Sequence, residues 1–64
     1  MITFIKVYDY ETGDPCLINV KMIESVVPMV GGSVIHITDH YYKVHDSVEQ
    51  IQMKIRKAQS WKGE

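Results

Sequence analysis

The chain has 64 residues, 45% of them hydrophobic, and its seven Lys and Arg against eight Asp and Glu give a formal net charge of −1. This length accommodates one domain with a single core. The balanced charge disfavours a protein whose main task is to grip nucleic-acid phosphates, because such proteins carry a clear basic excess.

Composition also predicts the compartment. Cys16 is the one cysteine, so no internal disulfide can form, and a lone cysteine is typical of a reducing environment. Lys6 and Asp9 interrupt the first apolar residues before a signal peptide could form. No apolar run approaches the roughly 20 residues of a membrane helix. We therefore expect a cytoplasmic protein with no membrane insertion.

Taken in chain order, five segments rich in β-branched and aromatic residues are predicted to be strands, with turn residues such as Gly, Asp and Pro between them. The segment 21–29 is ambiguous: its first half can be a turn that carries Ile23 inward, and Pro28 either ends the following strand or confines it to a sheet edge. The predicted strands are 2–8, 16–20, 24–28, 33–38 and 41–45.

The last two predicted strands form a hairpin. If Asp39 and His40 are a two-residue loop, Ile35, Ile37, Tyr42 and Val44 share one face, which is predicted to be a core face. The other face carries both apolar and polar residues and is predicted to be partly exposed to solvent. It holds Val34, His36, Thr38, Tyr41, Lys43 and His45. His40 is a costly loop residue, because favoured loops of this length carry Gly, so a longer loop remains an alternative.

A C-terminal helix over 47–60 follows from the spacing of its apolar residues. Val48, Ile51, Ile55 and Ala58 fall on one stripe. The helix start has two alternatives, since both Asp46 with Glu49 and Ser47 with Gln50 have the spacing of a capping box. The predicted fold is therefore α+β: a small antiparallel meander of four or five strands, able to curl, followed by one helix.

The residues that could carry chemistry favour structural interpretations. His36, His40 and His45 lack a partner Cys or carboxylate at ligand spacing, so we predict no metal site. Cys16 has no neighbour in sequence that would lower its pKa, and a half-buried apolar role is preferred. We predict no catalytic residue and no cofactor, and hence no enzyme.

Two further groups of residues, the acidic residues near the first turn and the tyrosines, are also predicted to have structural roles. Asp9, Glu11 and Asp14 are predicted to form a solvated turn, with a weak cation site as the alternative. The four tyrosines could stack on bases, but few basic residues lie among them, so cross-strand packing is preferred. Gly31 and Gly32 precede no helix and are not predicted to bind phosphate.

One feature is not explained by these structural roles: the predicted strands carry apolar residues on both faces, for example Val26 and Val27. One helix covers one face of a small sheet, so the second face must be covered by curling or by another subunit. Met and Trp are enriched at interfaces. The candidate interface residues are Met29, Met53, Trp61, Tyr41 and His36.

The run LINVKMIESVVP, continued by SVIHITDHYYKVHDSVEQIQMKI, resembles the small flagellar FlbD family, also called SwrD-like. The shared pattern comprises Ile23-Glu24 with a hydrophobic pair, a strand–turn–strand, and the entry Asp46-Ser47-Val48-Glu49 into a C-terminal helix. The turn Asp39-His40 departs from a family turn that tends to contain Gly, and Gly31-Gly32 is additional. Similar small proteins occur in phage and mobile-element contexts. The resemblance implies a small cytoplasmic accessory of the flagellar motor, or a phage-encoded relative, and no catalytic or binding residue is transferred.

The predicted function is a non-enzymatic protein-interaction module whose partner is itself, as a homo-oligomer, or a larger protein assembly. The alternative is a nucleic-acid-binding regulatory protein, which the charge balance disfavours.

Overall fold

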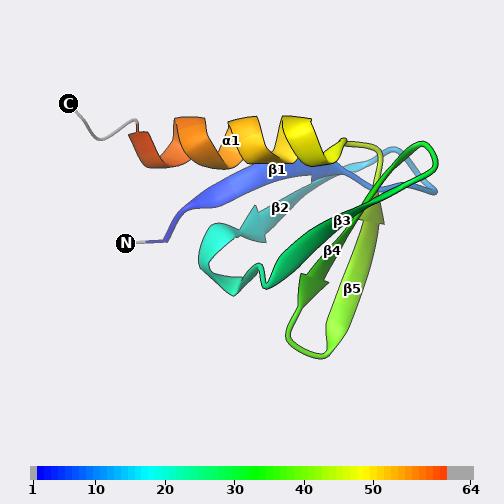
Figure 1. Cartoon of the computed structure of the whole chain (residues 1–64), viewed down its shortest axis with the longest axis horizontal. Helices are drawn as coiled ribbons and strands as arrows, with labels where there is room; N and C mark the ends of the chain where they lie inside the picture. Colours follow the sequence, from blue (N-terminus) through cyan, green and yellow to red (C-terminus); the bar gives the residue numbers. More distant parts are fainter. Residues whose placement is uncertain (1, 61–64) are drawn as a thin grey trace.

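A computed structural model of the chain describes residues 2–60 and shows five strands followed by one helix (Figure 1). All neighbouring strands are antiparallel, and they form a two-stranded and a three-stranded sheet in meander order. The predicted α+β class is therefore confirmed. The elements are β1 (Phe4–Tyr8), β2 (Pro15–Asn19), the 3₁₀ turn η1 (Val20–Met22), β3 (Ser25–Met29), β4 (Gly32–Ile37), β5 (His40–Val44) and α1 (Val48–Ser60).

The two sheets meet where β1 and β5 end. An isolated bridge pairs Asp9 with Val44. The Tyr10 amide donates to the Lys43 carbonyl at 2.9 Å, and the His45 amide donates to the Tyr8 carbonyl at 2.8 Å. From this junction the sheets diverge, so the chain forms two sheets instead of the single predicted one.

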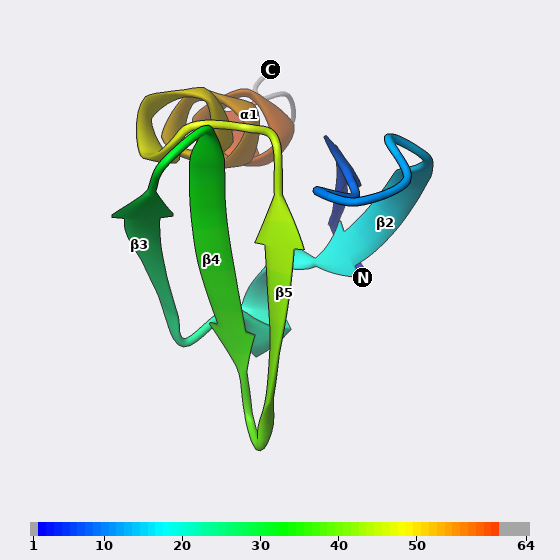
Figure 2. The same cartoon turned by 90° about the vertical axis from the view of Figure 1, so that its right-hand side faces the viewer.

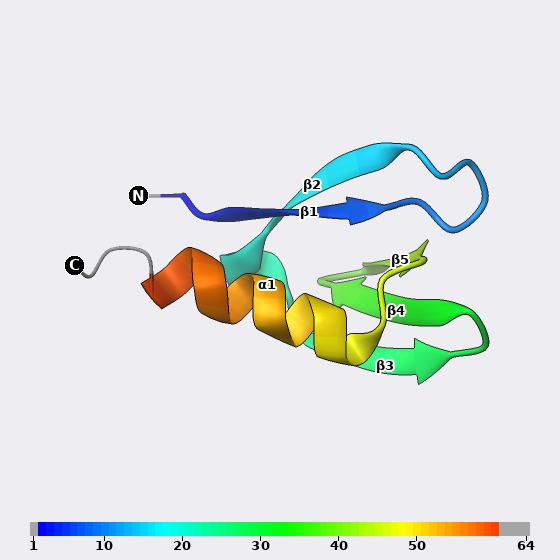
Figure 3. The same cartoon turned by 90° about the horizontal axis from the view of Figure 1, so that it is seen from above.

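The core lies between the inner faces of the sheets and α1, which crosses the opening between them (Figures 2 and 3). Alternate residues of a strand face the same side, and this period puts Ile5 and Val7 of β1 inside while Phe4 and Tyr8 stay outside. From the predicted helix stripe, Ile51 is fully buried, and Ile55 and Ala58 pack against the core. The buried apolar residues are Ile5, Val7, Ile18, Ile35, Val44 and Ile51.

The β4–β5 hairpin turns one residue earlier than predicted. Ile37 pairs with His40, so the loop is Thr38-Asp39, and Thr38 has a φ of 50°, a value uncommon for a β-branched residue. The pairing differs from the predicted one by two residues. Because side chains alternate with a period of two, a shift of two leaves every side chain on its predicted face.

The predicted core face of this hairpin is only partly correct. Ile35 and Val44 are buried and Ile37 is partly buried, but Tyr42 is exposed. Tyr42 lies on β5, an outermost strand of its sheet, whereas Ile35, its cross-strand partner, lies on the central strand β4. The bounds of all elements differ from the predicted ones by at most two residues.

The segment after η1 resolves the sequence ambiguity. Ile23 packs against the core, as a turn would place it, and β3 continues through Pro28 as the outermost strand of its sheet. Proline is tolerated there because an edge position requires no ladder hydrogen bond from its nitrogen.

Candidate functional site

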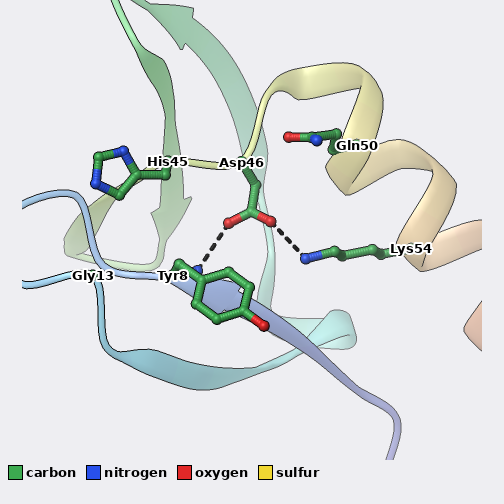
Figure 4. Close-up of a pocket in the computed structure, with 6 residues that line it drawn as sticks. All are labelled: Tyr8, Gly13, His45, Asp46, Gln50 and Lys54. Carbon is green, nitrogen blue, oxygen red and sulfur yellow. Dashed lines mark hydrogen bonds and ion pairs between the residues drawn. The ribbon is translucent and has the colours of Figure 1, made fainter.

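A group of polar side chains surrounds Asp46, at the point where β5 leads into α1 (Figure 4). The Asp46 side chain is 6% exposed, and its Oδ1 accepts a hydrogen bond of 2.8 Å from the Tyr8 amide. Its Oδ2 pairs with Lys54 Nζ at 2.5 Å. Asp46 therefore links the C-terminal end of β1 to the middle of α1.

Further bonds extend this group. Lys54 Nζ also donates to the Lys6 carbonyl at 2.6 Å, and it lies 5.4 Å from the centre of the Tyr8 ring. On the other side, the buried Ser33 hydroxyl donates to the Asp46 carbonyl at 2.6 Å. We call Tyr8, Ser33, Asp46 and Lys54 the Asp46 junction.

Electrostatics at the junction keep the carboxylate ionised. Burial raises the pKa of Asp46, but the hydrogen bonds from Lys54 and the Tyr8 amide, together with the Lys54 charge, outweigh it and hold that pKa below its usual range. The carboxylate is thus fully engaged in structural bonds. It offers neither an unpaired base nor a proton donor near neutral pH.

Helix α1 begins beside the Asp46 junction. Of the two predicted capping boxes, the structure contains the second, Ser47 with Gln50. Ser47 Oγ accepts from the Gln50 amide at 3.1 Å, and Gln50 Oε1 accepts from the Ser47 amide at 2.8 Å. This reciprocal pair is a capping box. Asp46 is not the cap, because its carboxylate is turned toward Tyr8 and Lys54.

The three histidines lie apart. His36 is on β4, His40 begins β5 next to the loop, and His45 stacks on Tyr10 with ring centres 5.1 Å apart. Within residues 2–60, no three His, Cys, Asp or Glu side chains are grouped so that they could hold a metal ion.

Cys16 and the acidic turn also have structural surroundings. Cys16 packs against the core, and burial, followed by the charges of Asp9 and Asp46, raises the pKa of its thiol. Asp9 accepts bonds from the Glu11 amide and from the amide and hydroxyl of Thr12. These bonds lower the pKa of Asp9, and they stabilise the turn between β1 and β2.

Several of the sequence-predicted interface residues lie on the outer side of the β3–β4–β5 sheet, the side away from the core. The strand registers place Val27 beside Val34, with Lys43 beyond them, and place Ser25, His36 and Tyr41 in the next row. Met29 continues this face on β3. We call Val27, Met29, Val34, His36 and Tyr41 the outer face.

This face is largely open. Val27 is 41% exposed and Tyr41 is 62% exposed, whereas Met29, Val34 and His36 are partly buried by their neighbours on the sheet. Its polar centre is organised, since Ser25 Oγ and His36 Nδ1 are 3.1 Å apart and the His36 and Tyr41 rings are 6.0 Å apart. Tyr10 covers the end near Gly31, with its hydroxyl bonded to the Val30 carbonyl.

Three of the five candidate interface residues therefore share one surface. Met29, His36 and Tyr41 lie on the outer face, whereas Met53 is exposed on α1 and Trp61 lies outside the described residues. Sequence reasoning did not single out Val27 and Val34 as interface candidates. Their alternation with the inward-facing Val26 and Ile35 was the pattern that could have identified them.

Comparison with protein-family models finds no matching family, and comparisons with curated proteins and with solved structures find no match either. Among residues 2–60 there is no helix with the length and apolar character needed to span a membrane.

Proposed function

We propose that this chain is a small non-enzymatic protein-interaction module that self-associates through the outer face. The observation that carries the proposal is the group of apolar and aromatic side chains on the side of β3, β4 and β5 away from the core, where Val27 and Tyr41 are exposed and Met29 and Val34 are partly exposed. Burying such side chains stabilises an assembly by about 25 cal/mol for each Å² of apolar area.

The small size of the domain supports a second copy of the chain as the partner that covers the outer face. Within residues 2–60 the core contains six buried apolar residues, and domains of this size commonly gain stability from a partner. A stable interface covers about 800 Å² on each partner, roughly one-sixth of the 4687 Å² that this chain exposes. Two outer faces related by a twofold axis would bring the same apolar rows together.

The resemblance to the FlbD family supports an accessory role in a larger flagellar or phage-encoded assembly. The residues that carry it are mainly strand and cap positions, including Ile35 in the core and Ser47 in the capping box. These positions concern fold more than function. The larger assembly is therefore proposed as a second partner, and self-association is tested first.

The test is a pair of matched substitutions. Val27→Lys places a charge on the outer face, whereas Val30→Lys makes the same change at an exposed loop position beyond that face. We expect light scattering across a dilution series to show loss of the oligomer for Val27→Lys and an unchanged mass for Val30→Lys, with circular dichroism confirming that both are folded. An equal response of the two variants would contradict an interface on the outer face.

A further inference from the structure

The two-stranded sheet of β1 and β2 has two outer edges, and its hydrogen bonds show which backbone groups lie on each. The strands are antiparallel, and the Val20 amide donates to the Thr3 carbonyl at 2.8 Å, so these two residues form a hydrogen-bonded pair. Such pairs alternate along the strands with pairs whose amides and carbonyls point away from the partner strand. On β2, the residues that point away are Pro15, Leu17 and Asn19.

The outer edge of β1 is closed by the rest of the chain. By the same alternation, Lys6 and Tyr8 point their backbone groups away from β2. The Lys6 carbonyl accepts a hydrogen bond from Lys54 Nζ at 2.6 Å. The Tyr8 amide donates to Asp46 Oδ1, and the Tyr8 carbonyl accepts from the His45 amide, both at 2.8 Å. Another strand therefore cannot pair along this part of β1.

The outer edge of β2 is open. In the sheets formed by residues 2–60, β2 pairs with β1 alone, and Figure 3 shows it on the outside of the fold. Edge strands are commonly protected by charged side chains or by a proline within the strand. The sequence of β2 is PCLIN, so the strand carries no charge and has proline only at its first position. Its central residue, Leu17, is 61% exposed, and β2 thus offers an uncharged edge to another strand.

We propose that β2 pairs along this edge with β2 of a second copy of the chain, antiparallel and centred on Leu17. In this register the Leu17 amide of each copy donates to the Leu17 carbonyl of the other. Each Asn19 amide donates to the Pro15 carbonyl of the other copy, and the missing amide of proline leaves no unpaired donor at that end. The two exposed Leu17 side chains contact each other across the twofold axis.

The charges at the two ends of β2 favour a second copy of the chain as its partner. Asp14 directly precedes the strand, and Lys21 lies two residues after its end. An antiparallel neighbour with an acid before its strand and a lysine after it would bring opposite charges together at both ends. β2 itself has this order of charges. A parallel neighbour of the same sequence would instead place like charges side by side, which is unfavourable.

The contact is small, which determines where it should be observed. A stable interface covers about 800 Å² on each partner, whereas β2 has five residues and adds a single row of backbone bonds. We therefore expect β2 edges to pair at millimolar concentration, above the range in which outer faces associate. The pairing does not rest on the proposed function, because β2 belongs to the other sheet. Where both contacts form, β2 pairing links outer-face dimers, in which the edges are held at a high local concentration.

Asn19 provides a matched pair of substitutions that test the edge. Its φ of −72° suits proline, whose ring fixes φ near −65°. Because the Asn19 amide lies on the open edge, Asn19→Pro deletes an edge donor and leaves the β1–β2 ladder intact, whereas Asn19→Ala keeps that donor. Both variants lose the side-chain bond from Asn19 to the Lys21 amide. Their difference therefore reports on the edge amide alone.

The measurement is NMR of the isotope-labelled chain, concentrated from tens of micromolar to a few millimolar. It is made on the unaltered chain and on Val27→Lys, in which the outer face does not pair. We expect the Leu17 amide to shift with concentration in both. In a mixture of labelled and unlabelled chains, we expect a contact between Leu17 side chains of different copies. Asn19→Pro should weaken the pairing about tenfold, which corresponds to about 1.4 kcal/mol, and Asn19→Ala should change it by less than about twofold.

Three outcomes would overturn the proposal. The first is a Leu17 amide that does not shift with concentration in Val27→Lys, and the second is an equal effect of Asn19→Pro and Asn19→Ala. The third is a shift of the β2 amides when the capped peptide Thr-Val-Thr-Val-Thr is added but not when the chain is concentrated, which would assign the edge to a strand of another protein. The outer face is tested separately, because its association is measured by mass at lower concentration.

Discussion

The Asp46 junction and the outer face belong to the same small fold, but they differ in how far the contacts of their side chains are made within the chain. At the junction the buried Asp46 and Ser33 have partners, and no buried side-chain polar atom among residues 2–60 lacks one. On the outer face, Val27 and Tyr41 leave much of their surface in water. The contrast separates the part of the chain that closes the fold from the part that we propose as an interface.

The largest effect on stability is expected from a substitution that breaks the Asp46 junction. Asp46→Ala removes the acceptor of the partly buried Tyr8 amide and the partner of Lys54, and we expect it to lower the free energy of unfolding by about 2–4 kcal/mol, since groups that lose their partner away from water are costly. Urea denaturation measures this loss. Asp39→Ala removes a carboxylate from the exposed hairpin loop and should cost less than about 0.5 kcal/mol; equal losses in the two variants would mean that the junction does not close the fold.

The same junction predicts a dependence of stability on pH. Because the pKa of Asp46 is lowered in the folded state, its contribution is present above the ordinary carboxyl pKa of about 3.9 and is lost as pH falls through the folded value. The pKa of Asp9 is lowered too, so it acts in the same direction. Melting temperatures between pH 2 and pH 6 should fall less steeply in Asp46→Asn than in the unaltered chain, and parallel curves would exclude Asp46 as a source of the dependence.

A smaller effect is expected at the helix start. Ser47→Ala removes one half of the capping box and should destabilise the fold by about 1 kcal/mol. Ser47→Asp keeps an acceptor at the same position and should recover most of that loss in the same urea experiment. A full loss in both variants would indicate that the hydroxyl acts through something other than the cap.

The difference between these regions also explains what the sequence could predict. Local patterns were sufficient for the α+β class, for the α1 stripe and for the two alternative capping boxes. The choice of Ser47 over Asp46 was not predictable, because the Tyr8 amide that holds Asp46 lies 38 positions away. The faces of the β4–β5 hairpin were correct despite an early turn, because the pairing differs by an even number of residues.

Exposure was harder to predict than orientation. Tyr42 faces the predicted side of β5 but is not covered, since β5 is an edge strand, whereas its buried partner Ile35 lies on the central strand β4. Met29 was a candidate because of its residue type, and the predicted hairpin put His36 and Tyr41 on one face together with Val34. The register of β3 on β4 shows that Met29 and Val27 share that face.

The most direct test of self-association is the solution mass of the unaltered chain, measured by sedimentation equilibrium from low micromolar to several hundred micromolar concentration. The chain has a mass of 7.4 kDa. Association of two outer faces predicts a mass that rises toward twice this value as the concentration increases. A mass that stays at 7.4 kDa over the whole range would contradict self-association and would leave the outer face to a different protein.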